Sequence, residues 1–405
     1  MTEMHDERPF GRAAFGRVGG PGRPGHPAAR SRRTALRAVA SAVVAAIPLA
    51  ACSGGDSDAG PTISVAATDT TCSPSATSAT AGTTHFTLTN KGKRVTELYI
   101  MRADGSIAAE RENIGPGTTA TLTAELGAGD YKIRCRPGGT GEGVYAALKV
   151  TGEVKAAASD PRLTSAVDTY RQYVLEQSKA SLAGAAQLRA AIAAGDVAKA
   201  KALYPASRVG WERIEPVAES FGDIDPKVDL READLAAGQT WTGWHVIEKG
   251  LWVTNSTAGL LPVADQLIVD LKDLVARVPG AQITPTSMAN GAKELLDEVA
   301  TGKVTGEEET FSHTDLVDFQ ANIDGAQTVH ELLQPVVTVT NRDLATRVDA
   351  AFSALQQRLS TLRTGAAGTA FVSYDKVDEQ TRRALSADVN ALAEPLSGLA
   401  AAVAS

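Results

Sequence analysis

The stretch LTSAVDTYRQYVLEQSKASLAGAAQLRAAIAAGD, residues 163–196, decides the fold class of the C-terminal part of this protein. Its apolar residues recur at intervals of three and four, the period of an amphipathic α-helix. The same period appears in LATRVDAAFSALQQRLSTL, residues 344–362, and turn residues separate about eight such segments. Residues 161–405 are therefore predicted to form an up-and-down helical bundle, or two bundles side by side.

The part of the chain before this helical region follows a different period. Residues 61–152 contain short alternating segments such as HFTLTN (85–90), TELYIM (96–101) and TATLTAEL (119–126), with Gly, Pro, Asn and Asp turns between them. Short strands at this spacing predict a small all-β sandwich. The alanine-rich segment 153–160 is the expected linker, so the fold class is multi-domain, β-sandwich followed by all-α bundle.

The N-terminus indicates export. Residues 1–30 are rich in Gly, Pro and Arg and are predicted to be disordered. Arg32 and Arg33 then precede an apolar stretch that is too short to cross a bilayer, a pattern similar to a twin-arginine signal, and LAAC resembles a lipobox that ends at Cys52. We expect residues 1–51 to be the tail and signal, Cys52 to carry the lipid, and residues 52–60 to be a tether. The mature chain would then be extracytoplasmic, anchored through Cys52 to the outer face of the cytoplasmic membrane.

The charge of the mature chain excludes some partners. Residues 1–51 carry eight arginines against three carboxylates, so the formal charge of −7 for the whole chain hides −12 in the remainder. Nucleic acid and anionic lipid surfaces both require a basic face, so we expect no nucleic-acid partner. An acidic chain can attract cations.

Two cysteines remain after Cys52. An even pair, Cys72 and Cys135, in an oxidising compartment favours a disulfide. The alternative is a thiolate metal site that also uses Glu97. A type 1 copper centre needs two histidines and usually a methionine, whereas this region has only His85 and Met101, both before Cys135.

The segment WTGWHVIEKGLW, residues 241–252, holds one histidine and one glutamate among three of the four tryptophans. In a helix, His245 and Glu248 lie three positions apart and therefore face the same spot. We also expect Trp241 and Trp252 to lie on that helical stripe. A buried glutamate needs a compensating partner, so either the two side chains pair with each other or a cation lies between them.

A second segment favours the cation. GWERIEPVAESFGDIDPKVDLRE, residues 210–232, places Glu212 and Glu215 three positions apart beside the fourth tryptophan, and Asp229 follows in the acidic connection. Carboxylates of one helix that face a histidine and a glutamate of another are typical of iron and manganese sites in helical bundles. The hypothesis requires that these side chains converge and that arginine or lysine does not neutralise each of them.

A third acidic segment is GEEETFSHTDLVDFQANIDGAQTVHELLQP, residues 306–335. Glu307 to Glu309 resemble the solvated start of a helix, where negative charge is favoured. His313 and Asp315 could be ligands or helix caps. HELLQ is similar to the zinc-protease motif HExxH, but Gln334 stands where the second histidine is required, so we predict no metal there.

Taken together, these motifs resemble a known family. ERENIGPG (110–117), GDYKIRC (129–135), GWHVIEKGLW (243–252) and FSHTDLVDFQANIDGAQ (311–327), behind a lipoprotein signal, are similar to the EfeO-type iron-uptake lipoproteins. These combine a cupredoxin-like domain with an imelysin-like, or peptidase M75, helical domain marked by an HxxE motif. The resemblance covers essentially the whole mature chain.

The resemblance implies a non-enzymatic protein that binds iron, with Fe³⁺ as the expected occupant and Cu²⁺ or Zn²⁺ as substitutes. It implies delivery to an iron permease in an EfeUOB-type system that also contains a haem peroxidase. The implied metal ligands are Glu212, Glu215, Asp229, His245, Glu248 and Glu309, with Glu308 as the alternative to Glu309. Two other functions stay open: an M75-type metallopeptidase, and a redox module that oxidises Fe²⁺ through the cupredoxin-like domain.

Overall fold

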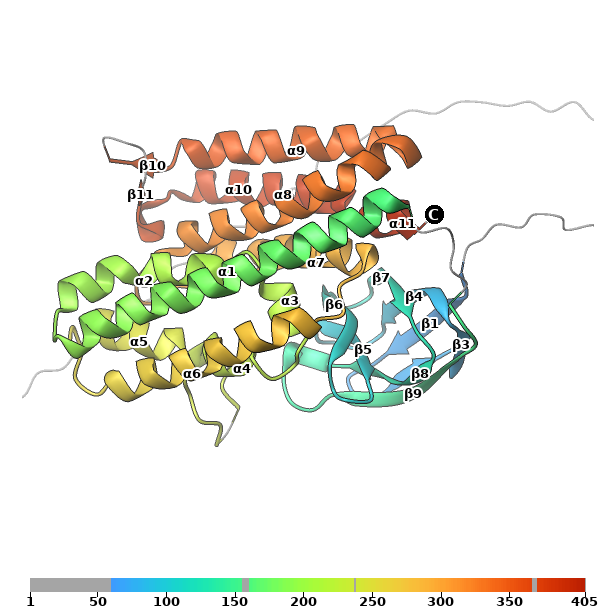
Figure 1. Cartoon of the computed structure of the whole chain (residues 1–405), viewed down its shortest axis with the longest axis horizontal. Coiled ribbons are helices and arrows are strands. Elements are labelled where there is room, and N and C mark those ends of the chain that lie inside the picture. The colour runs from blue at the N-terminus through green and yellow to red at the C-terminus, as the bar shows by residue number, and fades with distance from the viewer. Residues whose placement is uncertain (1–59, 155–159, 237, 366–369, 405) are drawn as a thin grey trace, which may run out of the picture. The chain divides into compact units, whose positions relative to one another are not determined.

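The computed structural model describes residues 60–154, 160–236, 238–365 and 370–404. A β-sandwich comes first in the chain and a helical domain follows, so the predicted order of the two folds is confirmed (Figure 1). The expected export signal, Cys52 and all but Gly60 of the tether lie outside the described residues, as do residues 155–159 of the linker. Within the described ranges, no helix is long and apolar enough to cross a membrane.

The β-sandwich consists of a four-stranded and a five-stranded sheet, with strand orders β2-β1-β4-β7 and β3-β9-β8-β5-β6. Strands β1 and β4 pair in parallel, as do β3 and β9, and the other pairs are antiparallel. The strands are β1 (Thr62–Ala67), β2 (Cys72–Pro74), β3 (Ser78–Thr80), β4 (Gly82–Asn90), β5 (Thr96–Arg102), β6 (Ile107–Ile114), β7 (Thr119–Leu126), β8 (Gly129–Cys135) and β9 (Val144–Thr151).

The core of the sandwich follows from the alternation of apolar residues. In β4, Phe86 and Leu88 are fully buried, while Thr87 between them and Thr89 after them are partly exposed. Side chains of a strand point to opposite faces in turn, so this pattern turns one face of each sheet inward. Cys72 of β2 and Cys135 of β8 form a disulfide that joins the two sheets.

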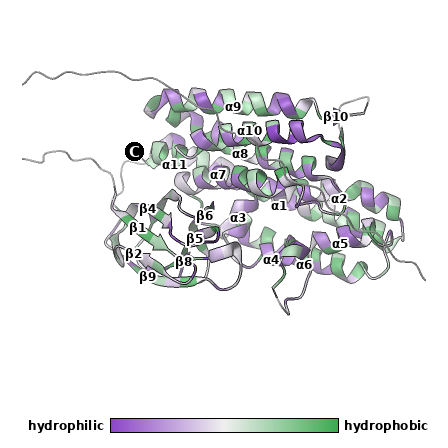
Figure 2. Ribbon diagram, turned by 180° about the vertical axis from the view of Figure 1, so that it is seen from behind, coloured by the Kyte–Doolittle hydropathy of each residue, from purple (hydrophilic) through white to green (hydrophobic). Residues whose placement is uncertain are grey.

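The helical domain consists of long amphipathic helices with shorter ones between them. Hydrophobic and hydrophilic residues alternate along helices such as α9 and α10 (Figure 2). The helices are α1 (Pro161–Ala193), α2 (Val197–Glu212), α3 (Glu215–Glu219), α4 (Asp225–Val228), α5 (Trp244–Trp252), α6 (Leu261–Arg277), α7 (Pro285–Thr301), α8 (Asp315–Thr340), α9 (Arg342–Ser360), α10 (Glu379–Leu396) and α11 (Leu399–Ala404). Among the described residues the bundle therefore has more helices than the eight expected, because short ones occupy the connections.

Helices α1 and α2 pack closely because a glycine faces the contact. A Cβ atom on Gly210 would lie 2.4 Å from the carbonyl oxygen of Gln177, so only glycine fits there. The opposite face of α2 is also buried and carries Tyr204, Arg208 and Glu212. The close packing thus fixes the position of two charged side chains inside the bundle.

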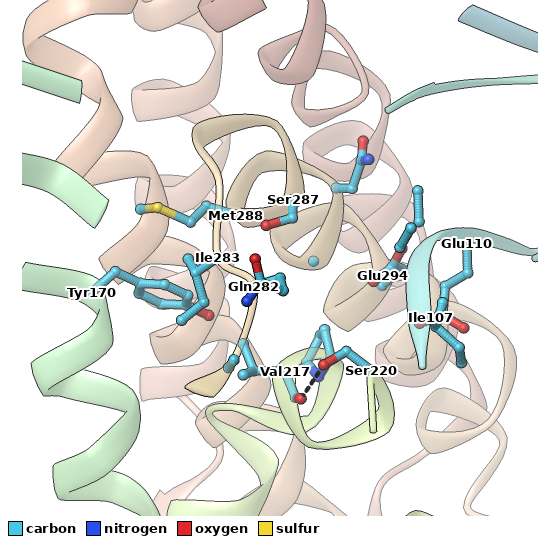
Figure 3. A pocket seen from close by; sticks show the side chains of 16 residues that line it. Ile107, Glu110, Tyr170, Val217, Ser220, Gln282, Ile283, Ser287, Met288 and Glu294 are labelled. Atoms are coloured by element: carbon cyan, nitrogen blue, oxygen red, sulfur yellow. Dashed lines mark hydrogen bonds between the residues drawn. The ribbon is translucent and has the colours of Figure 1, made fainter. Parts of the chain in front are cut away.

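The sandwich contacts the helical domain through β6 and β7. The Nδ2 atom of Asn290 on α7 donates a hydrogen bond to the carbonyl oxygen of Thr123. Beside this contact is a small pocket lined by Glu110 of β6 and Glu294 of α7 (Figure 3). Burial, together with the nearby charge of Glu112, raises the pKa of Glu294 to about 8. Burial and the charge of Glu294 likewise raise the pKa of Glu110 well above its usual range.

Candidate metal centre

Helix α5 carries the HxxE pair, and a glycine sets where this helix begins. Gly243 has a φ of 88°, and a Cβ atom there would lie 2.2 Å from the carbonyl oxygen of Val228. Only glycine combines that backbone conformation with so close an approach. Because α5 begins after it, Trp241 lies outside the helix and its Nε1 donates to the carbonyl of Leu230. The prediction that Trp241 shares the stripe of His245 was wrong.

His245 and Glu248 face each other in the core. Their side chains are 2% and 1% exposed, and Nδ1 of His245 lies 3.0 Å from Oε2 of Glu248. The other oxygen of Glu248 accepts hydrogen bonds from the backbone N–H groups of Phe311 (2.9 Å) and Ser312 (2.7 Å). Burial alone would raise the pKa of Glu248, but the bond to His245 and these N–H donors lower it. Glu248 is therefore a carboxylate anion held in a fixed orientation.

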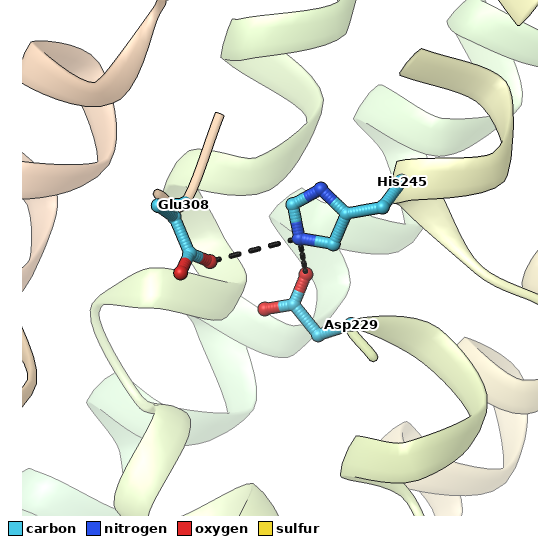
Figure 4. Close-up of side chains that lie close together, drawn as sticks. All are labelled: Asp229, His245 and Glu308. Atoms are coloured by element: carbon cyan, nitrogen blue, oxygen red, sulfur yellow. Dashed lines mark ion pairs between the residues drawn. The ribbon is translucent and has the colours of Figure 1, made fainter. Parts of the chain in front are cut away.

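The second ring nitrogen of His245 points toward two more carboxylates (Figure 4). Nε2 lies 3.4 Å from Oδ1 of Asp229 and 3.7 Å from Oε1 of Glu308, and it has no hydrogen-bond partner in the described part of the chain. Burial would lower the pKa of His245, but the carboxylates of Asp229, Glu248 and Glu308 outweigh burial and raise it well above its usual range. The ring is thus poised to hold a cation, either a proton or a metal.

Both Glu308 and Glu309 reach this region, although neither belongs to a helix. Burial would raise the pKa of Glu308, but the charges of Lys303 and His245 lower it to about 2. Glu309 accepts a hydrogen bond from Ser312 at 2.6 Å, and burial raises its pKa to about 8. The interpretation of Glu307 to Glu309 as a solvated helix start was wrong, because no helix of the described chain begins at these residues. Only Glu307 is exposed, since internal cations favour burial of the next two glutamates.

Two groups of donor atoms follow from this geometry. Asp229, His245 and Glu308 form one, and His245, Glu248 and Glu309 form the other, each with its ligand atoms within 4.8 Å of one another. His245 belongs to both groups. Four of the six predicted ligands, Asp229, His245, Glu248 and Glu309, thus lie close together. Glu308, the alternative to Glu309, joins them. Asp229 and Glu308 also line a cleft of about 1030 Å³, which gives small ions a way in.

Glu212 and Glu215 lie beside this centre. Helix α2 ends at Glu212 and α3 begins at Glu215, so the expected continuous helix is broken between them. The Nζ atom of Lys303 nevertheless bridges both carboxylates, at 2.7 Å and 3.2 Å. Asn322 donates to the same two side chains at 3.1 Å and 3.3 Å. Glu215 belongs to separate acidic groups that do not include His245.

Arg208 was not foreseen from the sequence. Its side chain is fully buried, and its guanidinium contacts five carboxylates, those of Glu212, Asp229, Glu308, Glu309 and Asp318. Burial would lower its pKa, but these carboxylates raise it well above the usual range. In the sequence, only the four-residue spacing between Arg208 and Glu212 indicated one of these contacts. Lys303 is far from Glu212 in the sequence, so no local pattern indicated their contact.

The sequence hypothesis required that arginine or lysine does not neutralise each of the carboxylates, and Arg208 and Lys303 test this requirement. Glu212, Glu215, Asp229, Glu308 and Glu309 each contact Arg208 or Lys303, whereas Glu248 contacts neither among the described ion pairs. The carboxylates are therefore partly neutralised. Seven carboxyl groups surround these two cations, namely Glu212, Glu215, Asp229, Glu248, Glu308, Glu309 and Asp318. Burial raises the pKa of Glu215, Glu309 and Asp318, and the pKa of His245 is also raised, so bound protons offset part of the negative charge. A multivalent cation that displaced these protons would meet a strongly acidic set of donors.

The remaining candidate residues are not part of these two donor groups. His330 of the HELLQ segment pairs through Nε2 with Asp349 at 2.7 Å. Glu97 accepts a hydrogen bond from Tyr99 at 2.8 Å and pairs with Arg136 at 3.3 Å. Asp315 accepts the backbone N–H of Glu309, at 3.1 Å, and so supports the acidic segment.

The fold and the site define a class: a cupredoxin-like sandwich followed by a helical domain with a buried HxxE centre. The imelysin (peptidase M75) family matches residues 166–399 and the cupredoxin-like domain family matches residues 40–144. The chain is 38% identical over 346 residues to the iron uptake system component EfeO of Escherichia coli strain K12 and to that of Shigella flexneri, which covers 84% of this chain and 90% of each relative. The chain belongs to the imelysin family, in the two-domain form that EfeO represents.

Proposed function

We propose that this protein is an extracytoplasmic iron-binding protein that captures Fe³⁺ and delivers it to a membrane permease. The observation that carries the proposal is the placement of His245, whose two ring nitrogens lie among the carboxylates of Asp229, Glu248 and Glu308. The relatives are named as iron uptake components, which supports iron as the cargo.

The donor set fits a hard cation. Carboxylate oxygens with a single imidazole suit iron in its higher charge states, whereas zinc and cuprous sites recruit thiolates or more histidines. We propose Asp229, His245, Glu248, Glu308 and Glu309 as ligands that contact the ion. Glu212 and Glu215, beside Lys303, add negative charge around it. Cu²⁺ and Zn²⁺ are the expected substitutes in vitro.

The uptake system itself is part of the proposal. An iron permease would accept the metal, and a haem peroxidase would work beside this protein. Cys52, which lies outside the described residues, would carry the lipid that holds the protein at the membrane surface. The cleft along Asp229 and Glu308 supports exchange of an ion with such a partner.

Two alternatives find less support. A metallopeptidase needs a general base near a metal-bound water. Glu248 is a poor base, because His245 and two backbone N–H groups lower its pKa. A redox centre based on thiolate-bound copper needs a free cysteine in the β-sandwich, but Cys72 and Cys135 are joined in a disulfide. We therefore propose a binding protein without catalytic turnover.

The test is metal analysis and titration of the chain from Ser53 to Ser405 with Fe³⁺ as its nitrilotriacetate complex, Fe²⁺, Cu²⁺ and Zn²⁺. We expect binding of Fe³⁺ that His245→Ala and Glu248→Ala each abolish. The proposal fails if the folded protein takes up no Fe³⁺, or if both variants bind it as the wild type does. Cleavage of peptides that depends on His245 would establish the peptidase alternative instead.

A further inference from the structure

Arg208 lies where the proposed ligands meet. Its Nε atom lies 2.8 Å from Oε1 of Glu309, and its Nη2 lies 3.0 Å from Oε1 of Glu308. Nη1 and Nη2 also contact Asp229 and Glu212. Three carboxylates that we assign to the metal, those of Asp229, Glu308 and Glu309, thus form ion pairs with one guanidinium, which is fully buried and cannot exchange these partners for water.

The surroundings of Arg208 hold it in place. Its guanidinium carbon lies 5.5 Å from the ring centre of Trp244, and Nε1 of Trp244 donates to Ser207 at 3.1 Å. Trp244 is the residue before His245, so the helix that carries the HxxE pair also supports the arginine. The metal centre and its internal cation are therefore built as one unit.

A metal ion and this guanidinium need the same oxygen atoms. Each oxygen lone pair that accepts an N–H bond from Arg208 is unavailable to a metal ion, and two positive charges a few ångströms apart repel each other in a buried site. This repulsion grows in proportion to the charge of the ion. Arg208 must then weaken the binding of a trivalent ion more than that of a divalent ion.

We propose that Arg208 is an intramolecular competitor of the metal cargo, a residue that sets the affinity of the centre and its dependence on ion charge. The inference deepens the proposed function and rests on it. When the ion leaves, the guanidinium stabilises the carboxylates that the ion had neutralised. A transport protein gains from this because release no longer requires that every ligand be protonated.

The experiment compares Arg208→Gln with the wild-type protein, using Zn²⁺ and Ga³⁺ as the probes. These ions have the same closed electron shell and no redox chemistry, so they differ mainly in charge. Arg213→Gln is the matched control, since Arg213 follows α2 directly but pairs with a single, half-exposed carboxylate, Asp324, at 2.9 Å. Dissociation constants come from competition with a chelator of known affinity.

We expect Arg208→Gln to bind both ions more tightly, with the larger gain for Ga³⁺. If the gain is about 10-fold for Zn²⁺, proportionality to charge gives about 30-fold for Ga³⁺. Arg213→Gln should change neither constant by more than about twofold. Equal or weaker binding by folded Arg208→Gln, or a gain that does not depend on ion charge, overturns the inference.

Loss of Arg208 leaves carboxylates that repel one another, so the variant could unfold without metal. Thermal unfolding with and without Ga³⁺ covers this case. We expect Ga³⁺ to raise the melting temperature of Arg208→Gln more than that of the wild type, because the ion replaces the missing charge. A variant that stays unfolded in Ga³⁺ contradicts the inference, whereas a wild-type protein that binds neither ion nor Fe³⁺ contradicts the proposed function.

Discussion

The Nε2 atom of His245 lies 3.4 Å from Oδ1 of Asp229, and carboxylates raise the pKa of this histidine well above its usual range. At neutral pH the ring therefore carries a proton that a metal must displace. Glu309, with a pKa of about 8, holds a second proton at pH 7. We expect Zn²⁺ binding at pH 7 to release close to two protons and to strengthen as the pH rises toward 8.

The measurement is calorimetric titration in two buffers with different ionisation enthalpies. Glu309→Gln has no carboxyl proton to lose, so it should release about one proton fewer than the wild type. Heats that do not depend on the buffer would show that the ligands bind metal without losing protons.

Replacement of His245 tests the centre directly. Residues that only orient a metal ligand typically contribute about 10- to 100-fold to metal affinity. His245 is itself a ligand in both donor groups, so His245→Ala should reduce Zn²⁺ affinity by more than about 100-fold. The control is His330→Ala, since His330 is an equally buried histidine that pairs with a carboxylate outside the centre. Similar losses of Zn²⁺ affinity in the two variants would argue for a general effect on folding.

Gly243 should be required for the position of α5. In Gly243→Ala, the new methyl group would meet the carbonyl of Val228 at 2.2 Å and push α5 away from Asp229. We expect reduced Zn²⁺ affinity and lower stability. Gly259 is the control: its φ of 79° is similar, but an added Cβ atom would have no neighbour within 4 Å. Gly259→Ala should therefore cost only the strain of a left-handed backbone, about 1–2 kcal/mol of unfolding free energy, and leave Zn²⁺ affinity unchanged. Urea unfolding and calorimetry of both variants separate steric from conformational effects.

The disulfide should stabilise the sandwich without affecting metal binding. Cys72 and Cys135 are 63 positions apart, and closing a loop of that length contributes about 4 kcal/mol in the chain-entropy treatment. We expect Cys72→Ser to lower the unfolding free energy of the sandwich by about this amount and to keep Zn²⁺ affinity. A thiol assay on unreduced, denatured wild-type Ser53–Ser405 should find no free thiol, and one that finds two would contradict the disulfide.

Glu294 makes stability depend on pH at the contact between β6 and α7. Its pKa is about 8 in the folded protein and about 4.5 in the unfolded chain, so the folded state binds the proton more tightly. The contribution of Glu294 to the free energy of unfolding is fully present below pH 4.5 and is lost as the pH rises through 8. Glu294→Gln remains neutral and should therefore gain stability relative to wild type between pH 5 and 8.5.

Urea midpoints at these two pH values provide the measurement. Exposed Glu331, on α8, supplies the control variant Glu331→Gln, which should follow the wild-type pH dependence. If the urea midpoints of Glu294→Gln and wild type differ by the same amount at both pH values, burial does not hold a proton on Glu294.

Local periodicity in the sequence determined the two fold classes, because side-chain period decides whether a segment buries one face as a strand or as a helix. It also determined that His245 and Glu248 face one spot, since residues three apart in a helix are neighbours. The break between Glu212 and Glu215 and the start of α5 after Gly243 depend on contacts with distant segments, and periodicity did not reveal them.

Only the tertiary structure decided which charges meet. Arg208 lies 100 positions from Glu308 and 110 from Asp318, so nothing local to α2 shows that its arginine is buried among carboxylates. Likewise, three consecutive glutamates resemble a solvated surface until Lys303 and Arg208 make burial of two of them favourable. The sequence therefore predicted an acidic centre around one histidine. The cations within that centre came from packing, because charge balance in a buried site is a property of all the helices together.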